Sequence, residues 1–584
     1  MPKKSQWEEI KNLRRLWPFL KTEPAILSVT LLLIPVISIV QLAQPLVLKN
    51  AIDKGVISGD SKELSFFAFT YFILVVCEYI SRASQSICST VLVENMIKNM
   101  REKLVSHLMR QSLNFHHRNL SGVLVTRTTS DFDNLSESLS EGVLQSIVGV
   151  VSIIGCVVGM VSLHPTLGIL STLSIPIMIY CITWFSQKIK LSLHDARRYL
   201  ASLNAYTQEC LQGISSVKVL SAEKSVNEKF KGLNEDFRKA QMNSVTFDAV
   251  LFSILEGSSS VIIGLMLWVI LTRVNVDTTL SAGVIVAFVR YLLQMFDPLK
   301  QLGQTVAFLQ GVFTSTDRIF SLFDQNERIQ GDKVLDRIEG HIVFENVAFV
   351  YPKASEENTK GFSLENINLQ IKKGQSLALV GPTGGGKSTL IKLLTKQYEG
   401  YSGNITIDGV DISTLEPFAL RNKIGIVPQD LVLFGGSIGF NIGLNHPDVS
   451  FEDIKRASKL MGLHPFVQTL PGAYDYLIQE DGSNLSVGQK QLIVFARALA
   501  RNPHLIILDE ATSALDPLSE SMVQRALDNI FKLKTVIVIA HRLSTIRHCN
   551  KIAVVHNGKI MEEGGHEELI AREGLYHHLS LSLI

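Results

Sequence analysis

The feature that most limits how this chain can fold is a stretch of 46 residues, 142–187, that contains no Asp, Glu, Lys or Arg. A helix needs about 20 apolar residues to cross the hydrocarbon core of a bilayer, which is about 30 Å thick. The stretch therefore has room for two membrane-spanning helices, and the sequence LHPT at 163–166 supplies a turn between them. The other long apolar stretches are 24–48, 64–90, 249–271 and 278–309. Together these stretches predict six spans.

The loops between the predicted spans are of two kinds. Segments 94–141 and 188–248 are long and rich in Lys and Arg, whereas the alternate loops are short. Basic loops stay in the cytoplasm, and the N-terminus lies on their side of the membrane. Because six is an even number, the chain after residue 312 returns to the cytoplasm, where ATP is found.

The two basic loops are too long for simple turns and carry helical patterning. We expect the second to fifth membrane helices to extend beyond the bilayer and to be joined there by short bends, with ordinary solvated loops as the alternative. The best candidates for the bends are 114–122 and 209–216. Residues 1–21 are basic and amphipathic, which indicates a helix on the cytoplasmic membrane surface rather than a cleavable signal peptide.

Composition supports a membrane protein and argues against some other classes. Mean hydropathy is +0.23 and only 19% of the residues are charged, which is unusual for a soluble protein. A net charge of +2 gives no reason to expect nucleic acid as a partner. The six cysteines show no CxxC pattern and no metal-ligand spacing, so we expect isolated thiols.

From residue 342 the pattern changes to short β runs separated by glycine turns. Strands that alternate with helices predict a mostly parallel sheet, with ligands at the carboxyl ends of its strands. The run SLALV at 376–380 leads directly into GPTGGGKS at 381–388, which matches the phosphate-binding pattern GxxxxGK[ST] in its strand–loop–helix context. In such a loop, backbone N–H groups wrap the phosphates, and the helix N-terminus adds partial positive charge.

Two residues of this loop have predicted roles of their own. Lys387 should reach the β- and γ-phosphates of ATP, and the hydroxyl of Ser388 should bind Mg²⁺. The residues expected to bind ATP in this loop and the helix after it are Gly381, Pro382, Thr383, Gly384, Gly385, Gly386, Lys387, Ser388 and Thr389.

Two further strand ends carry candidate catalytic groups. The run LIILDE ends at Asp509 and Glu510. In P-loop enzymes an acid at the position of Asp509 holds Mg²⁺, and Glu510 would then orient and polarise the attacking water. A third strand ends at His541, whose imidazole could contact the γ-phosphate. Each of these residues alone is more often structural, but together with the phosphate loop they predict an ATPase.

The segment NLSVGQKQL at 484–492 resembles the signature of the ATP-binding-cassette (ABC) ATPases, and other motifs of that family match in order. By this resemblance Tyr351, in FVYP, stacks on adenine. Gln429, in IVPQD, contacts Mg²⁺ and senses the membrane domain. Asp516, in SALD, belongs to the D-loop, and His541, in AHRLST, to the switch loop. Six spans before one such domain resemble an exporter half-transporter of the bacterial lipid flippase and multidrug type.

The same resemblance implies a dimer, because in this family the signature of one domain closes over the phosphate loop of another. The residues that would contact ATP held by a second chain are Ser486, Gly488, Gln489 and Asp516. The chain has one phosphate loop and one signature, so its partner is either a second copy or another half-transporter. One departure from the usual LSGGQ signature is Val487, which replaces its first glycine. We expect function to survive this change, at a lower efficiency if the valine hinders close approach to the phosphate.

Charged residues within the predicted spans are candidates for the substrate cavity. The candidates are Glu78, Arg82, Arg290 and Lys300. Glu256 and Asp297 lie in the same spans, and Asp297 is the only obvious local partner of Arg290 and Lys300. If the three cations face the cavity, they favour an anionic headgroup, as on a lipid, whereas drugs and peptides remain alternatives. Glu78 and Arg82 lie four residues apart and could simply pair with each other.

We therefore predict a six-helix transmembrane domain followed by an α/β P-loop nucleotide-binding domain. The expected boundaries are 1–21 for the interfacial helix, 22–315 for the transmembrane domain, 316–341 for a linker and 342–584 for the nucleotide-binding domain. The expected function is ATP-driven export or flipping of an amphipathic substrate by a dimer, with ATP and Mg²⁺ as cofactors. Alternatives are an ATP-gated channel and one half of an obligate heterodimer. The expected location is the bacterial inner membrane, with both termini in the cytoplasm.

Overall fold

The computed structural model describes residues 13–273, 281–325, 331–351, 363–479, 482–509 and 524–582, except positions 526, 529, 532, 533 and 541. The chain divides into two compact units. The first comprises Met1–Met109 and Gly122–Gln325, and the second comprises Arg110–Ser121 and Asn326–Ile584.

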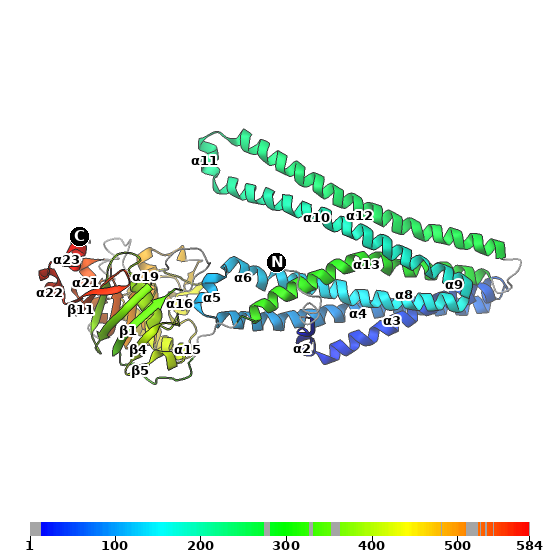
Figure 1. The fold of residues 1–584 in the computed structure, drawn as a ribbon. Helices are drawn as coiled ribbons and strands as arrows, with labels where there is room; N and C mark the ends of the chain where they lie inside the picture. The colour runs from blue at the N-terminus through cyan, green and yellow to red at the C-terminus, as the bar shows by residue number, and fades with distance from the viewer. Residues whose placement is uncertain are drawn as a thin grey trace. The chain divides into compact units, whose positions relative to one another are not determined.

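The described part of the first unit is entirely helical (Figure 1). Its helices are α2 (Trp17–Leu20), α3 (Pro24–Asn50), α4 (Ser61–Met109), α6 (Ser121–Thr128), α7 (Ser130–Glu137), α8 (Gln145–Leu163), α9 (Pro165–Thr172), α10 (Ser174–Gln212), α11 (Ile214–Val219), α12 (Glu223–Arg273) and α13 (Ala282–Phe323), with π-helical turns η1 (Ala51–Val56) and η2 (Ser138–Leu144). Helices α10 and α12 pack along each other and lean away from the other helices toward their α11 end (Figure 1).

Within the described residues, six helical stretches are long and apolar enough to cross a membrane, which agrees with the predicted number. They are Pro24–Val56, Ser61–Met109, Ser121–Leu163, Pro165–Gln212, Glu223–Val269 and Ala282–Gln301. The middle four contain 43 to 49 residues, or about 65–75 Å of helix at 1.5 Å per residue. This is more than twice the thickness of a hydrocarbon core, which is the length that the predicted extensions beyond the bilayer require.

Local sequence signals set the helix ends. The predicted turn at 163–166 separates α8 from α9, where Pro165 takes the first helical position and the His164 ring accepts a hydrogen bond from the backbone N–H of Leu167. Ser281 caps α13 by accepting from the backbone N–H of Val284. The predicted bend at 209–216 contains the break between α10 and α11 at Gly213.

The predicted interfacial helix, 1–21, lies largely outside the described residues, which begin at 13. Its described end packs against the last turns of α13. Arg15 donates to both carboxylate oxygens of Asp324, at 2.8 and 2.6 Å, and its guanidinium lies 4.1 Å from the centre of the Phe320 ring. The start of the expected linker needs correction, because α13 continues unbroken past residue 316 to Phe323 and the two units divide between Gln325 and Asn326.

The second unit is an α/β domain with a six-stranded sheet in the order β12-β11-β3-β10-β9-β6. The strands from β11 to β6 are parallel and β12 is antiparallel, so the predicted mostly parallel sheet is confirmed. These strands are β3 (Ser376–Val380), β6 (Ile424–Val427), β9 (Leu505–Asp509), β10 (Thr535–Ile539), β11 (Lys551–His556) and β12 (Lys559–Gly564).

Two smaller sheets accompany it, an antiparallel one in the order β2-β1-β4-β5 and the pair β7-β8. Their strands are β1 (Ile342–Val350), β2 (Ser363–Ile371), β4 (Ser402–Ile407), β5 (Val410–Asp411), β7 (Gly436–Ser437) and β8 (Leu477–Ile478). The helices are α5 (Leu113–Arg118), α14 (Lys387–Leu394), α15 (Pro417–Asn422), α16 (Ile438–Gly443), α17 (Phe451–Leu460), α18 (His464–Thr469), α19 (Val487–Ala500), α21 (Leu543–Arg547), α22 (His566–Ala571) and α23 (Leu575–Ser582).

Alternate residues of the parallel strands enter two different apolar cores. In β9, Ile506 and Leu508 pack with α19, whereas Leu505 and Ile507 pack with α14 and the antiparallel sheet. Both faces of the sheet are thus covered, which explains why these strands read as continuous apolar runs. The candidate site lies at the carboxyl ends of these strands.

Candidate nucleotide-binding site

The predicted nucleotide residues begin at one edge of the parallel sheet. Leu379 of β3 and Asp509 of β9 both pair with Ile539 of β10, and Leu508 pairs with Val427 of β6. Three segments therefore start at the same level of the sheet. They are the phosphate loop after β3, Asp509 at the end of β9, and the segment after β6 that carries Gln429. This is the carboxyl edge at which doubly wound sheets bind ligands.

The phosphate loop is folded tightly against β11. A Cβ atom on Gly381 would lie 2.0 Å from the carbonyl oxygen of Val555, so only glycine fits there. Gly386, directly before α14, has φ of 112°, a conformation that favours glycine. The loop is also tied to the turn after β11, because the N–H of Gly558 donates to the carbonyl of Gly385 at 3.0 Å.

Lys387 lies inside this loop with only 6% of its surface exposed. Its Nζ donates to the carbonyl oxygens of Gly381, at 2.7 Å, and Pro382, at 3.0 Å. A buried ammonium group needs such partners, and here they hold it in the curve of the loop. Ser388 is half-buried at the start of α14, and Thr389 is buried.

The remaining candidates for catalysis are described only in part. Asp509 is half-buried at the end of β9, and Gln429 is exposed two residues after β6. Glu510, Asp516 and His541 lie outside the described residues, so their roles stay predictions. Within the described ranges no three His, Cys, Asp or Glu side chains group as a metal site. The Ser388 hydroxyl and the Asp509 carboxylate nevertheless offer the oxygen ligands that Mg²⁺ prefers. Water and phosphate oxygens usually complete the coordination shell of the ion.

Tyr351, the candidate adenine-stacking residue, belongs to an aromatic cluster. Its ring meets the rings of Phe349 and Tyr398 edge to face, with centroids 5.1 and 5.2 Å away. Its hydroxyl lies 3.0 Å from that of Thr389, one residue beyond Ser388. Tyr351 is thereby fixed beside the start of α14.

The cluster also joins a segment that the sequence analysis did not assign to this domain. Helix α5 lies in the predicted bend 114–122, and its Phe115 is 1% exposed. His117 of α5 makes a hydrogen bond with the hydroxyl of Tyr398 at 2.9 Å through its Nδ1. Burial raises the pKa of Tyr398 to about 12, so this hydroxyl stays protonated at physiological pH. The apolar Leu113 and Phe115 in an otherwise polar bend were the signal that could have revealed this contact.

The signature segment begins α19 with a complete cap. The hydroxyl of Ser486 accepts from the backbone N–H of Gln489 at 3.2 Å, and the Gln489 side chain accepts from the backbone N–H of Ser486 at 2.9 Å. Gly488 is buried, whereas Val487 is 49% exposed at the first helical position. The valine fits the capped helix start with about half of its surface exposed, and Ser486 is exposed at the positive end of a 14-residue helix.

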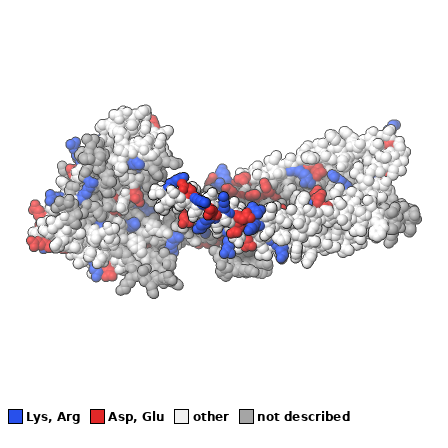
Figure 2. All heavy atoms as spheres, turned by 90° about the horizontal axis from the view of Figure 1, so that it is seen from above, with Lys and Arg blue, Asp and Glu red and all other residues white. Residues whose placement is uncertain are grey.

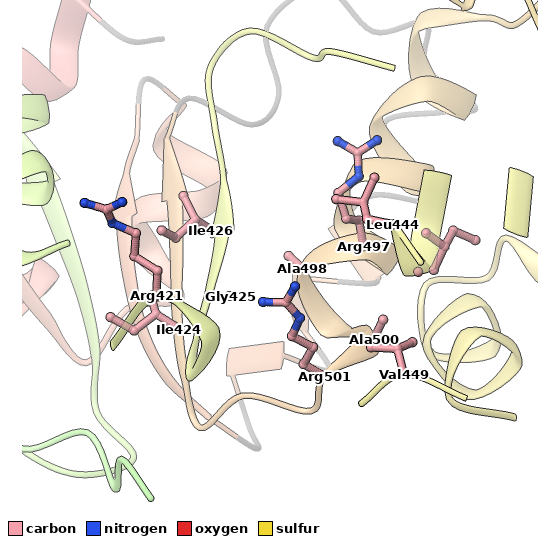
Figure 3. A pocket seen from close by; sticks show the side chains of 12 residues that line it. Arg421, Ile424, Gly425, Ile426, Leu444, Val449, Arg497, Ala498, Ala500 and Arg501 are labelled. Atoms are coloured by element: carbon pink, nitrogen blue, oxygen red, sulfur yellow. The ribbon is translucent and has the colours of Figure 1, made fainter. Parts of the chain in front are cut away.

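A pocket of about 180 Å³ lies between β6 and helices α16 and α19, and Arg421, Arg497 and Arg501 line it (Figure 3). Burial lowers the pKa of Arg497. Its guanidinium donates to the carbonyls of Asn441, at 2.7 Å, and Val432, at 3.0 Å. The buried Asn441 side chain in turn bonds to both backbone groups of Phe434. This network, which no motif predicted, ties the segment after Gln429 to the helix of the signature.

The intramembrane candidates of the first unit are mostly paired. The Glu78 carboxylate accepts from Arg82 at 2.8 Å, Gln41 at 3.0 Å and Gln44 at 2.6 Å. The pairing of Glu78 with Arg82, which we considered as the alternative to a cavity role, is therefore present. Lys300 lies 2.5 Å from Glu256 of α12 and 3.7 Å from Asp297.

Arg290 differs from the other two cations. It is exposed, and its side chain makes no polar contact with the described residues. Two of the three cations that motivated an anionic headgroup are thus already neutralised by acids of this chain. The expectation of a purely anionic substrate loses most of its basis.

Comparison with known proteins agrees with this architecture. The family model for the ABC transporter transmembrane region matches residues 27–299, and that for the ABC transporter domain matches residues 364–513. Similar curated proteins include an uncharacterized ABC transporter ATP-binding protein, YfiC, of Bacillus subtilis, 31% identical over 97% of this chain and 93% of that protein. An ATP-dependent lipid A-core flippase of Sodalis glossinidius is 31% identical over 98% of both chains. A solved structure of a bacterial Atm1-family ABC exporter with ATP bound has a TM-score of 0.76 at 24% identity, covering 95% of this chain and 98% of that one.

Proposed function

The chain belongs to the ABC transporter family and couples ATP hydrolysis to export across a membrane, and from this premise we propose that it works as a dimer that moves an amphipathic substrate by alternating access. The observation that supports the proposal most is the arrangement of the second unit. A phosphate loop, Asp509 and Gln429 begin at one sheet edge. The signature starts a separate helix whose first residues, Ser486 and Val487, are exposed.

The proposal of a dimer rests on the exposed signature at the start of α19. Helix α19 offers partial positive charge and the hydroxyl of Ser486 to a phosphate, and the sequence has one signature and one phosphate loop. We infer that Ser486, Gly488, Gln489 and Asp516 contact ATP held by a second chain. ATP then joins two nucleotide-binding domains, and hydrolysis separates them. Relatives named as lipid flippases and multidrug exporters support a lipid or another amphiphile as substrate.

Each half of the composite site has a defined task. Lys387 and the loop N–H groups hold the β- and γ-phosphates. Ser388, Asp509 and Gln429 would hold Mg²⁺, which supplies charge neutralisation for the transferred phosphoryl group. Glu510 takes the proton of the attacking water. Tyr351 stacks on the adenine.

We also propose a bacterial inner membrane location with both termini in the cytoplasm. The basic segments 94–141 and 188–248 support this orientation. They include the ends of α4, α10 and α12 that extend beyond the predicted spans.

The test is ATPase activity of the chain alone in lipid nanodiscs, with Glu510→Gln and the exposed-surface control Glu573→Gln. We expect turnover in the wild type and in Glu573→Gln, and none in Glu510→Gln, which should still bind ATP. Hydrolysis that persists in Glu510→Gln would contradict the catalytic role. A wild-type chain that binds ATP without turnover would contradict a self-sufficient homodimer and point to a second half-transporter.

A further inference from the structure

Helix α13 has one exposed stripe along its membrane-spanning part. The opposite face packs into the core through residues that are at most 4% exposed. Those residues are Val284, Ala287, Phe288, Tyr291, Leu292, Met295, Phe296 and Leu299. The exposed residues follow at intervals of three and four and are Val286, Arg290, Leu293, Asp297 and Gln301. Helical periodicity therefore places two opposite charges and an amide on a single face.

Such a stripe does not suit contact with lipid. Charged side chains within membrane spans face the interior of a bundle or a water-filled cavity, because exposing them to hydrocarbon is costly. Figure 2 shows one face of the molecule, where charges gather over the α11 ends of α10 and α12 and a smaller group of both signs lies farther along an otherwise uncharged surface. On α13 itself, Arg290 and Asp297 alternate along the exposed stripe with the apolar residues Val286 and Leu293.

The charges around the stripe form two poles. Lys300 contacts both Glu256 of α12, at 2.5 Å, and Asp297, at 3.7 Å. The Lys300 side chain is 21% exposed, whereas those of Glu256 and Asp297 are 59% and 74% exposed. One cation shared by two exposed carboxylates leaves this group with a formal charge of −1. Arg290 supplies +1, seven residues or about 10 Å along the helix from Asp297.

An apolar hollow lies close to the negative pole. It has a volume of about 470 Å³ on α12. Its lining residues are Val245, Thr246, Ala249, Val250, Ser253 and Ile254. Ser253 and Ile254 are less than one helical turn from Glu256, so a surface suited to hydrocarbon adjoins a surface suited to charge.

We propose that this polar face binds the headgroup of the exported substrate, and that the substrate is an amphiphile whose headgroup carries both a positive and a negative charge. The inference rests on the proposed export function and adds the class of substrate. The cationic group faces Glu256 and Asp297, the anionic group faces Arg290, and the apolar part lies along the hollow on α12. A purely anionic headgroup would meet two carboxylates at the negative pole, and a purely cationic one would be repelled by Arg290.

The test compares three fluorescent lipids with identical acyl chains in proteoliposomes that contain the full chain. Their headgroups are a sulfobetaine, with its ammonium group next to the chains and its sulfonate at the far end, phosphoglycerol and trimethylammonium, which are zwitterionic, anionic and cationic. We expect ATP-dependent movement of the zwitterionic lipid to exceed that of the other two by about tenfold, as one well-placed charge contact allows.

Two variants should then shift the preference among the three lipids, each in a different direction. Arg290→Gln should shift the ranking toward the cationic lipid, and Asp297→Asn should shift it toward the anionic lipid, each rate being divided by the ATPase rate of the same variant. Glu235→Gln, at an exposed acid on α12 outside the spans, is the matched control and should keep the wild-type ranking.

Three results would overturn the proposal. The wild type could move the anionic lipid fastest, or both variants could keep the wild-type ranking. Alternatively, Arg290→Cys in a chain without its native cysteines could cross-link to a second copy and be shielded from aqueous thiol reagents, which would make the face a subunit contact. Failure of the underlying export function looks different, because then no lipid moves and hydrolysis does not depend on Glu510.

Discussion

The nucleotide-binding unit and the membrane unit fix their charged residues in different ways. In the nucleotide-binding unit Lys387 is held by the carbonyls of Gly381 and Pro382, only five and six residues away. In the membrane unit Glu78 is held by Arg82, four residues away, but also by Gln41 and Gln44 from another helix. Lys300 is likewise held by Asp297, three residues away, and by Glu256, 44 residues away. A contact between residues close in the sequence can be recognised from a motif. A contact between two helices depends on how the helices pack. Conservative replacements should therefore fail in the first unit and be tolerated in the second.

The largest effect is expected at Lys387. Both Lys387→Ala and Lys387→Arg should lower the rate of ATP hydrolysis by about 10²–10³-fold, because a guanidinium is larger and planar and the loop leaves 6% of the side chain exposed. ATPase assays and nucleotide-binding titrations measure the change. Lys392→Arg, on the same helix, is the control, and Lys300→Arg in the membrane unit should keep most activity. If Lys387→Arg hydrolysed ATP at the wild-type rate, the contrast between the units would not hold.

The next effect concerns the stability of the membrane unit. Glu78→Ala leaves Gln41, Gln44 and Arg82 without their shared acceptor, so it should lower the free energy of unfolding by about 1–3 kcal/mol. Glu78→Gln keeps one acceptor and should cost less. Thermal unfolding in nanodiscs measures both, with the exposed Glu63→Ala as control. An unchanged midpoint for Glu78→Ala would show that the network does not stabilise the bundle.

The same contrast explains what could be predicted from the sequence. The six spans, the turn at 163–166 and the parallel sheet follow from apolar length and periodicity, which short segments carry by themselves. The phosphate loop and its place at the sheet edge follow from GPTGGGKS after a buried strand. The end of the transmembrane domain was placed at 315, eight residues before α13 ends at Phe323, because the hydropathy of the sequence falls before the helix ends.

Contacts between distant segments could not be predicted. Asp297 was recognised as a local partner for Lys300, but nothing near Lys300 in the sequence indicates its contact with Glu256, 44 residues away. The docking of α5 on Tyr398 joins residues 281 positions apart, and the Arg497–Asn441 bonds join residues 56 apart. Only the packing of whole elements brings these side chains together.

A smaller effect tests the link between α5 and the aromatic cluster. Tyr398→Phe and His117→Ala each remove one hydrogen bond and should each cost about 1 kcal/mol of unfolding free energy. The double variant should cost no more than either alone, because both remove the same bond. Tyr398→Ala should also raise the KM for ATP, since Tyr351 loses an edge-to-face neighbour, whereas Tyr398→Phe should leave KM unchanged. Additive losses in the double variant would contradict a direct bond.

The smallest effect is expected at Val487, where this chain departs from the usual signature. The side chain is 49% exposed and the backbone is that of a capped first helical turn, so Val487→Gly removes little packing within the chain. Greater backbone freedom should destabilise the helix start by less than about 1 kcal/mol. ATPase rates at saturating ATP should therefore change by no more than about twofold. An increase of tenfold or more would mean that the valine opposes closure over the phosphate loop of the second chain, and would place Val487 in the contact between the two nucleotide-binding domains.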